Sequence, residues 1–183
     1  MARFALLLLV LLLAAAYWLQ GRAPASEATG LGEGTFEGVE FWLFPKADPE
    51  ARWRLYAPLV RYDAARRVAE ARGEVRGERL VGEEVDLELS AKEVVIDQND
   101  NLITPEAEIT LPKECWRLYL KGDGSRQVRI DQRYGYTAPE FELEGPGVKV
   151  EGRGFSSDFG LTNARWRSGR EEWREDEATA CDH

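Results

Sequence analysis

Histidine is almost absent from this chain. Its single histidine, His183, is the last of 183 residues, and side chains at a chain end are usually frayed and solvated. Histidine is the usual base of nucleophilic active sites and a frequent zinc ligand. The sequence also has no glycine-rich phosphate-binding loop. We therefore expect no catalytic residues, no metal and no cofactor, and any energy that the protein uses must come from another protein.

The chain has fewer basic than acidic residues. The chain has 24 lysines and arginines against 33 acidic residues, so its formal net charge is −9. Nucleic acid is bound through a basic surface, and anionic lipid headgroups attract polybasic segments. The composition therefore argues against a nucleic-acid partner and against a polybasic contact with a membrane surface.

Long uncharged segments are absent except for residues 4–19, FALLLLVLLLAAAYWL. A helix over this stretch would be about 24 Å long, which is short of the ~30 Å hydrocarbon core of a bilayer. Two interpretations stay open. Ala14–Ala16 fits the cleavage site of a signal peptide, whereas Tyr17 and Trp18 fit the aromatic belt of a retained membrane anchor. In both cases the chain after Gly21 is exported.

Composition divides the chain into four parts. Residues 1–21 are the anchor or signal peptide, and residues 22–35 are rich in Gly, Ala, Pro and Ser, which is typical of a flexible linker. Residues 36–170 carry the segments with strand-like patterns. Residues 171–183 form an acidic C-terminal tail.

Cysteine is scarce, with two residues, Cys115 and Cys181. Outside the cytoplasm a disulfide between them is chemically permitted, and it would tie the acidic tail to the domain. The sequence contains no information on the distance between their Cα atoms. A disulfide and two unpaired thiols both stay open.

The hydrophobic pattern has a period of two. VDLELSAKEVVI (85–96), AEITL (107–111), EFELEG (140–145) and VKVEG (148–152) all alternate, and short polar or glycine-containing stretches separate them. This pattern predicts an all-β domain with many strands of about 5–10 residues.

Two local features of this pattern resemble functional motifs. Alternation places the carboxylates Glu84, Asp86 and Glu88 on one face of a strand, so we interpret them as a solvated face, not as the acid and base of a glycan-cleaving site. DQNDNLITPEAE (97–108) has the ligand spacing of a calcium loop. Its sixth position is Leu102, where that loop needs glycine, so we expect a hairpin turn.

Two pairs of segments have similar sequence patterns. WRLY occurs at 53–56 and at 116–119, and Tyr62-Asp63 and Ile96-Asp97 each precede a polar turn and a second strand. In each WRLY, alternation places Trp and Leu on one face of a strand. Stacked units of this kind bury a continuous apolar face.

The stretch WRLYAPLVRYDAARRVAEARGEV (53–75) resembles the opening of the periplasmic lipopolysaccharide-transport proteins of the LptC and LptA type, which share the OstA-like fold. The residues that carry this resemblance are Leu55, Ala57, Val60, Tyr62, Asp63, Gly73 and Val75. GPGVKVEGRGFSSDFGLTNARW (145–166) resembles the C-terminal edge of LptC. The order of segments is also similar, although residues 106–136 match poorly and the cysteines are not expected of that family.

This resemblance implies an open, twisted β-jellyroll preceded by a single N-terminal transmembrane helix. The jellyroll would enclose a groove for the acyl chains of lipopolysaccharide. The candidate groove residues are Leu55, Ala57, Val60, Tyr62, Leu87, Leu89 and Val95. An unpaired edge would join a partner jellyroll, and its candidate residues are Gly147, Val148, Val150 and Gly152.

The function implied is a lipid relay that is not an enzyme. The protein would sit in the inner membrane with one span and most of its chain in the periplasm. It would accept lipopolysaccharide or a related envelope lipid from an inner-membrane ABC transporter and pass it to an LptA-like jellyroll. The acidic charge implies that phosphorylated headgroups stay in solvent. The alternatives are a secreted β-solenoid that binds no lipid and an exported glycan-active enzyme.

Overall fold

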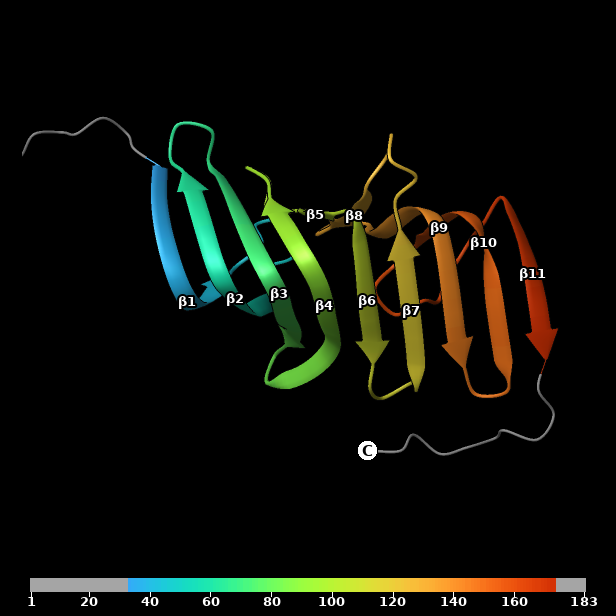
Figure 1. Ribbon diagram of the computed structural model, residues 1–183. Coiled ribbons are helices and arrows are strands. Elements are labelled where there is room, and N and C mark those ends of the chain that lie inside the picture. The colour runs from blue at the N-terminus through green and yellow to red at the C-terminus, as the bar shows by residue number, and fades with distance from the viewer. Residues whose placement is uncertain (1–32, 174–183) are drawn as a thin grey trace, which may run out of the picture. The chain divides into compact units, whose positions relative to one another are not determined.

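The computed structural model describes residues 33–173, and this part of the chain is all-β (Figure 1). Its eleven strands are antiparallel to their neighbours. The all-β class predicted from the alternating pattern is thus confirmed. The predicted anchor and nearly all of the predicted linker lie outside the described residues. Within 33–173 there is no helix that is long and apolar enough to cross a membrane.

The strands extend beyond both ends of the predicted domain. The first begins at Glu33 instead of 36, and the last ends at Trp173 instead of 170, so the start of the predicted acidic tail belongs to the sheet. The strands are β1 (Glu33–Leu43), β2 (Ala51–Asp63), β3 (Val68–Val81), β4 (Glu84–Ile96), β5 (Leu102–Thr104), β6 (Glu106–Leu111), β7 (Trp116–Lys121), β8 (Val128–Asp131), β9 (Gly135–Gly145), β10 (Val148–Ser157) and β11 (Ser168–Trp173).

Two strands each pair with three others, and this closes part of the sheet into a ring. β4 pairs with β3, β5 and β6, and β9 pairs with β7, β8 and β10. The ring therefore runs β4–β5–β8–β9–β7–β6. We call β1–β3 the N-terminal wing and β10–β11 the C-terminal wing, because they extend the sheet on either side of the ring.

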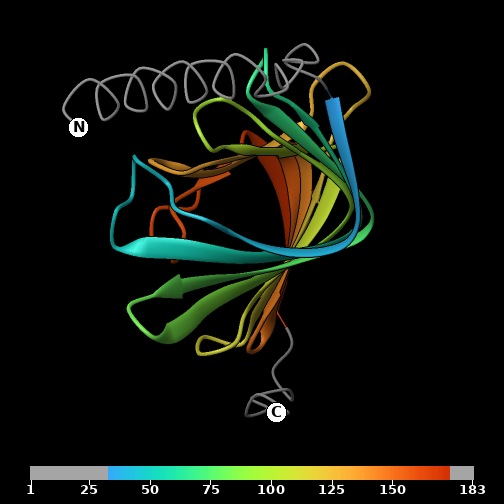
Figure 2. The same cartoon turned by 90° about the vertical axis from the view of Figure 1, so that its left-hand side faces the viewer.

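The long strands belong to two layers. In β4, Glu88–Ser90 pair with β6, whereas Val95 and Ile96 pair with β5. In β9, Glu140–Glu144 pair with β7, whereas Gly135–Thr137 pair with β8. One half of each strand thus lies in a β6–β7 layer and the other half in a β5–β8 layer. Figure 2 shows the strands curving from one layer into the other.

Proline and glycine lie opposite each other where the strands bend. Gly38, with φ of 59°, faces Pro58 in the β1–β2 ladder. Gly154, with φ of 72°, faces Pro139 in the β9–β10 ladder. Proline has no N–H to donate, and glycine adopts a positive φ without steric conflict. These pairs interrupt the ladder locally and, like a β-bulge, allow the strands to turn.

An apolar row crosses the inner face of the β6–β7 layer from the N-terminal wing to the C-terminal wing. Its members are successive register partners, and nearly all are buried. They are Phe41, Leu55, Gly77, Leu89, Ile109, Leu118, Leu143 and Val150. With neighbouring strands about 4.8 Å apart, this row is roughly 34 Å long.

Gly77 is needed in this row because two leucines meet over it. A Cβ atom there would lie 2.7 Å from Leu55 Cδ2, and Leu55 is itself buried and has little room to move. We expect Gly77→Ala to lower the free energy of unfolding by about 1–3 kcal/mol through overpacking. Urea denaturation followed by tryptophan fluorescence measures this change.

The matched control is Gly160→Ala. Gly160 is exposed in the connection between β10 and β11, and a Cβ atom there would have only ordinary contact with Thr162 at 3.8 Å. This variant should unfold within about 0.5 kcal/mol of the parent, as surface substitutions usually do. Equal stability of the Gly77→Ala variant and the parent would contradict the close packing of the row.

Candidate functional site

The space between the two layers is filled by one apolar cluster. The predicted groove residues Leu55, Ala57 and Val60 of β2 and Leu87 and Leu89 of β4 are all buried members of this cluster. The structure therefore brings these five side chains together on the inner face. They pack as core residues, and a role in lipid contact stays a prediction.

Val95 was expected to share the inner face with Leu87 and Leu89, and this is wrong. Its neighbours Val94 and Ile96 are buried in the core, so alternation turns Val95 to the other face, where it is half-buried. The reason is an irregularity in the β3–β4 register, at which Lys92 and Glu93 of β4 are both exposed between the buried Ala91 and Val94. This irregularity shifts the phase of the alternation in the adjoining part of β4.

The inner face is uncovered at the N-terminal wing. Tyr62 pairs with Ala69, and Ala69 pairs with the core residue Ile96, so the Tyr62 ring lies on the inner face. Phe36 pairs with the core residue Val60 and lies on the same face. Phe36 is nevertheless 53% exposed and Tyr62 is 41% exposed. We call these two aromatic residues the mouth of the interior.

The predicted partner edge is not an edge, and this expectation is corrected. Val148, Val150 and Gly152 belong to β10, which pairs with β9 on one side and with β11 on the other. Gly147 lies in the turn between β9 and β10, with φ of 72°. The unpaired edges among residues 33–173 are instead β1 and β11.

Strand β11 explains why glycine occupies position 152. A Cβ atom on Gly152 would lie 2.3 Å from the carbonyl oxygen of Ser168 and 2.8 Å from Gly169 Cα. The backbone that approaches this glycine therefore belongs to the same chain. SGREEW has no apolar alternation and all of its side chains are exposed, so no periodic pattern marks β11 in the sequence.

Proline at position 150 should destabilise the domain, because β10 is paired on both sides. Proline removes one ladder donor and leaves its acceptor unmatched, which costs about 1–3 kcal/mol for each unsatisfied group. We expect Val150→Pro to lower the urea midpoint clearly. Lys149→Ala is the control, since it removes only surface ion pairs with Glu142 and Glu144, and exposed ion pairs contribute little to stability. A Val150→Pro variant as stable as the control would show that β10 is peripheral to the fold.

A polar cluster lies at one end of the apolar interior. The indole N–H of Trp53 donates a hydrogen bond of 2.9 Å to Oε1 of Gln132. The backbone N–H of Gln132 donates to Oδ1 of Asn101 at 3.1 Å. Trp53 belongs to the N-terminal wing, whereas Gln132 lies in the β8–β9 turn of the other layer. These bonds therefore tie the two layers together.

Arg79 is the charged member of this cluster. It neighbours Trp53 in the β2–β3 register and is 5% exposed. Its guanidinium group forms ion pairs with Asp48 and Asp86, and its Cζ atom lies 4.1 Å from the centre of the Phe159 ring. A buried charge needs partners of this kind to be tolerated.

Tyr136 is buried beside Arg79 and Phe159. Its hydroxyl donates a hydrogen bond of 3.3 Å to the Phe159 carbonyl oxygen, and burial raises the pKa of Tyr136. The phenol therefore stays protonated and remains a donor. The sequence placed Trp53 on the inner face through the WRLY pattern, but Arg79, Gln132 and Tyr136 show no comparable local signal.

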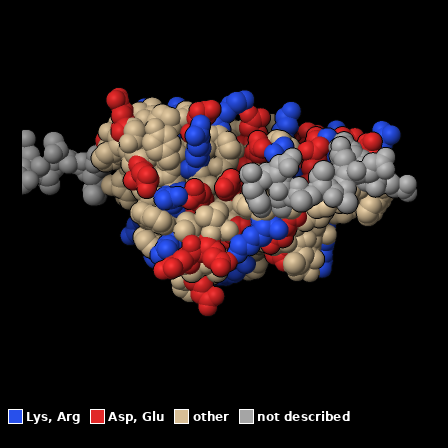
Figure 3. Space-filling model, turned by 90° about the horizontal axis from the view of Figure 1, so that it is seen from below, with Lys and Arg blue, Asp and Glu red and all other residues tan. Residues whose placement is uncertain are grey.

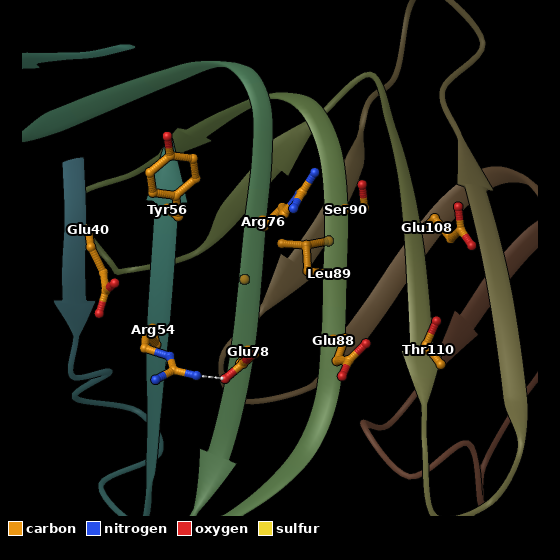
Figure 4. A pocket seen from close by; sticks show the side chains of 11 residues that line it. Glu40, Arg54, Tyr56, Arg76, Glu78, Glu88, Leu89, Ser90, Glu108 and Thr110 are labelled. Atoms are coloured by element: carbon orange, nitrogen blue, oxygen red, sulfur yellow. Dashed lines mark hydrogen bonds and ion pairs between the residues drawn. The ribbon is translucent and has the colours of Figure 1, made fainter. Parts of the chain in front are cut away.

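A separate hollow of about 670 Å³ opens on the outer face of β1–β4 and β6 (Figure 4). Arg54 and Glu78 form an ion pair of 2.5 Å within it. Its lining residues are Glu40, Arg54, Tyr56, Arg76, Gly77, Glu78, Glu88, Leu89, Ser90, Glu108 and Thr110. Acidic and basic side chains are also interspersed on the face that Figure 3 displays. The outer surface is thus polar opposite an apolar inner face.

The three carboxylates of the alternating segment 84–88 do not gather into an acid–base pair. Glu84 bonds to Lys113, and that hydrogen bond lowers the pKa of Glu84. A general acid acting near neutral pH needs the opposite shift. Asp86 is engaged by Arg79, whereas Glu88 lines the outer hollow.

The segment with calcium-loop spacing forms a turn between β4 and β5. Asp97 accepts hydrogen bonds from the backbone N–H groups of Asn99 and Asn101. Partial burial alone would raise the pKa of Asp97, but the bonds from Asn101 and Asn99 and the nearby Arg129 lower it below its usual range. The carboxylate therefore organises this turn.

Cys115 lies between β6 and β7 and is not a free thiol. Its proposed partner, Cys181, lies outside the described residues. The disulfide between them therefore stays a prediction.

Comparison with known proteins does not place the chain in a family. No protein-family model matches the chain, and no curated protein matches it significantly.

Proposed function

We propose that this protein is a carrier in a lipopolysaccharide export system, with no reaction of its own. Its strands would form an OstA-like β-jellyroll that holds the acyl chains of lipopolysaccharide, or of a related envelope lipid, between the two layers. The carrier would receive this lipid from an inner-membrane ABC transporter and pass it to an LptA-like jellyroll. Residues 1–21 would hold it in the inner membrane, with the domain in the periplasm.

The observation that carries this proposal is the apolar row that reaches from β1 to β10. Its length of roughly 34 Å exceeds the ~15 Å, half of the ~30 Å hydrocarbon core of a bilayer, that a single acyl chain spans. Acyl chains gain free energy in proportion to the apolar area that leaves water. A continuous apolar inner face gives a long chain such an environment without interruption.

The mouth supports the same proposal. Phe36 and Tyr62 lie on the inner face but are only partly covered, so the interior has an apolar entrance at the N-terminal wing. Exposed aromatic side chains that continue a buried apolar surface often mark a binding site. A lipid chain that contacted this pair would be continuous with the core cluster.

The edges β1 and β11 suit the proposed partners. An unpaired edge strand presents free N–H and C=O groups, to which another strand can add. We assign the junction with an LptA-like jellyroll to β11, in place of β10, and the contact with the ABC transporter to β1. The charged side chains of β11 would limit pairing with unrelated edges.

Tyr62 and Tyr56 allow a matched test of the lipid site. They lie on the same strand and have similar exposure, 41% and 45%. A register irregularity between Tyr56 and Leu59 separates them, so Tyr62 faces inward while Tyr56 lines the outer hollow. A p-benzoylphenylalanine residue at position 62 should crosslink to lipid in cells at least several-fold more strongly than one at position 56, as detected by mass spectrometry.

Three outcomes bear on this test. Preferential labelling at position 62 supports the proposed lipid-carrier function. Equal labelling at the two positions contradicts an inner lipid site. Labelling at neither position, in a protein that remains folded, favours the β-solenoid that binds no lipid.

A further inference from the structure

The connection between β10 and β11 folds onto the core. We call residues 158–166 the strap. Four of its side chains, Phe159, Leu161, Ala164 and Trp166, are partly buried and pack against the apolar cluster. The Trp166 ring lies 5.7 Å from Phe141, centre to centre. Surface loops are usually polar, so a strap with this composition covers apolar surface that would otherwise be exposed.

The strap is held together mainly by one carboxylate. Asp158 accepts hydrogen bonds from the backbone N–H groups of Thr162 and Asn163 and from both of their side chains. Partial burial alone would raise the pKa of Asp158, but the hydrogen bonds from Thr162 and Asn163 lower it below its usual range. Arg165 pairs through its backbone with Ser156 of β10. The strap is thus a self-contained loop whose base belongs to the C-terminal wing.

The strap reaches the opposite wing through a side-chain contact. The Phe159 ring lies under the guanidinium group of Arg79 on β3, at 4.1 Å. Among residues 33–173, the backbone hydrogen bonds of the strap outside the regular ladders stay within it or go to β10, and none reaches β1–β4. Separating the strap from the N-terminal wing would break no strand pairing.

Two buried donors lie in the cluster that the strap covers. Nε of Arg79 and Nε2 of Gln132 have no hydrogen-bond partner among the described residues. Arg79 is 5% exposed and Gln132 is 1% exposed. Trp53 lies next to Arg79 in the β2–β3 register, and its indole N–H donates a hydrogen bond to Gln132. Buried groups without partners are rare in native proteins, so an acceptor from outside the chain is the natural partner for these donors.

The charges around Arg79 determine whether a charged or an uncharged hydrogen-bond acceptor can bind there. Asp48 and Asp86 already pair with its guanidinium group, so the immediate surroundings carry an excess of negative charge. An anionic group would be repelled there. An uncharged oxygen, such as the carbonyl of an acyl ester or amide, can accept from both donors without that repulsion.

We propose that the strap is a lid over the interior, and that Arg79 and Gln132 beneath it form a subsite for an acyl carbonyl. This inference rests on the proposed lipid-carrier function. When a lipid enters, its chain takes the places of Phe159 and Leu161 against the core. Its carbonyl oxygen then accepts from Nε of Arg79 and Nε2 of Gln132.

The first test follows amide hydrogen exchange in the full-length chain, in detergent, with and without a monoacylglycerol. Lipid binding should speed exchange in residues 159–166, because the strap is displaced, and slow it in β2–β4. If the lipid binds while exchange in the strap stays the same or slows, the strap is not a lid, and the carrier function still stands. If the monoacylglycerol does not bind, the lid and the carbonyl subsite are wrong, whereas crosslinking at position 62 decides the carrier function.

The second test compares the monoacylglycerol with a 1-O-alkylglycerol of equal chain length, which lacks the carbonyl. The ester should bind about tenfold more tightly than the ether, because its carbonyl accepts from the two donors that the ether leaves unsatisfied. Gln132→Met removes one orphaned donor without adding a charge, although it also removes the acceptor of Trp53, and in a variant whose urea midpoint shows that it still folds it should abolish this preference. Equal affinities for ester and ether in the parent protein would overturn the carbonyl subsite.

The third test removes the side chain that competes with lipid. Phe159→Ala should bind the monoacylglycerol about tenfold more tightly, since an apolar occupant no longer has to leave the core. Tyr119→Ala truncates an exposed aromatic residue on the outer face of β7 and should bind like the parent. Unchanged or weaker binding by a folded Phe159→Ala variant would show that Phe159 does not occupy the lipid site.

Discussion

Backbone hydrogen bonding limits where a long strand can leave one sheet layer and enter the other. Inside a layer, neighbouring strands use nearly every N–H and C=O group, so a sharp turn needs a place where the ladder is interrupted. Gly38 opposite Pro58 and Gly154 opposite Pro139 are such places, because proline lacks the donor and glycine tolerates the positive φ. Both layers, and the interior between them, depend on these interruptions.

Irregularities in the ladders also decide how far the sequence predicts the site. Strict alternation places Leu87 and Leu89 on the inner face, because the side-chain period of a strand follows from its backbone. It fails at Val95, because Lys92 and Glu93 of β4 are both exposed where the register with β3 is irregular, and this resets the phase. β11 has solvent around all its side chains and shows no alternation. The meeting of Arg79 with Phe159 joins distant parts of the chain, so no local pattern reports it.

The polar cluster sets the interior apart from an ordinary core. Trp53 and Gln132 satisfy each other across the two layers, and Arg79 has two carboxylate partners. Nε of Arg79 and Nε2 of Gln132 have no partner among the described residues, and a buried donor of this kind costs about 1–3 kcal/mol. An apolar residue at either position would avoid that cost. Departures of this kind from the most stable choice are expected where a site serves binding.

A lipid carrier must also release its lipid. An acyl chain of about 14 carbons that entered a preformed empty groove would gain roughly 11 kcal/mol from burial alone, at about 0.8 kcal/mol per methylene. A chain that replaces Phe159 and Leu161 gains less, because it exchanges one apolar occupant of the core for another. The formal net charge of −9 adds no attraction for a phosphorylated headgroup. If the protein is the proposed lipid carrier, a filled interior under a displaceable strap would keep its affinity for lipid in a range where onward transfer is possible.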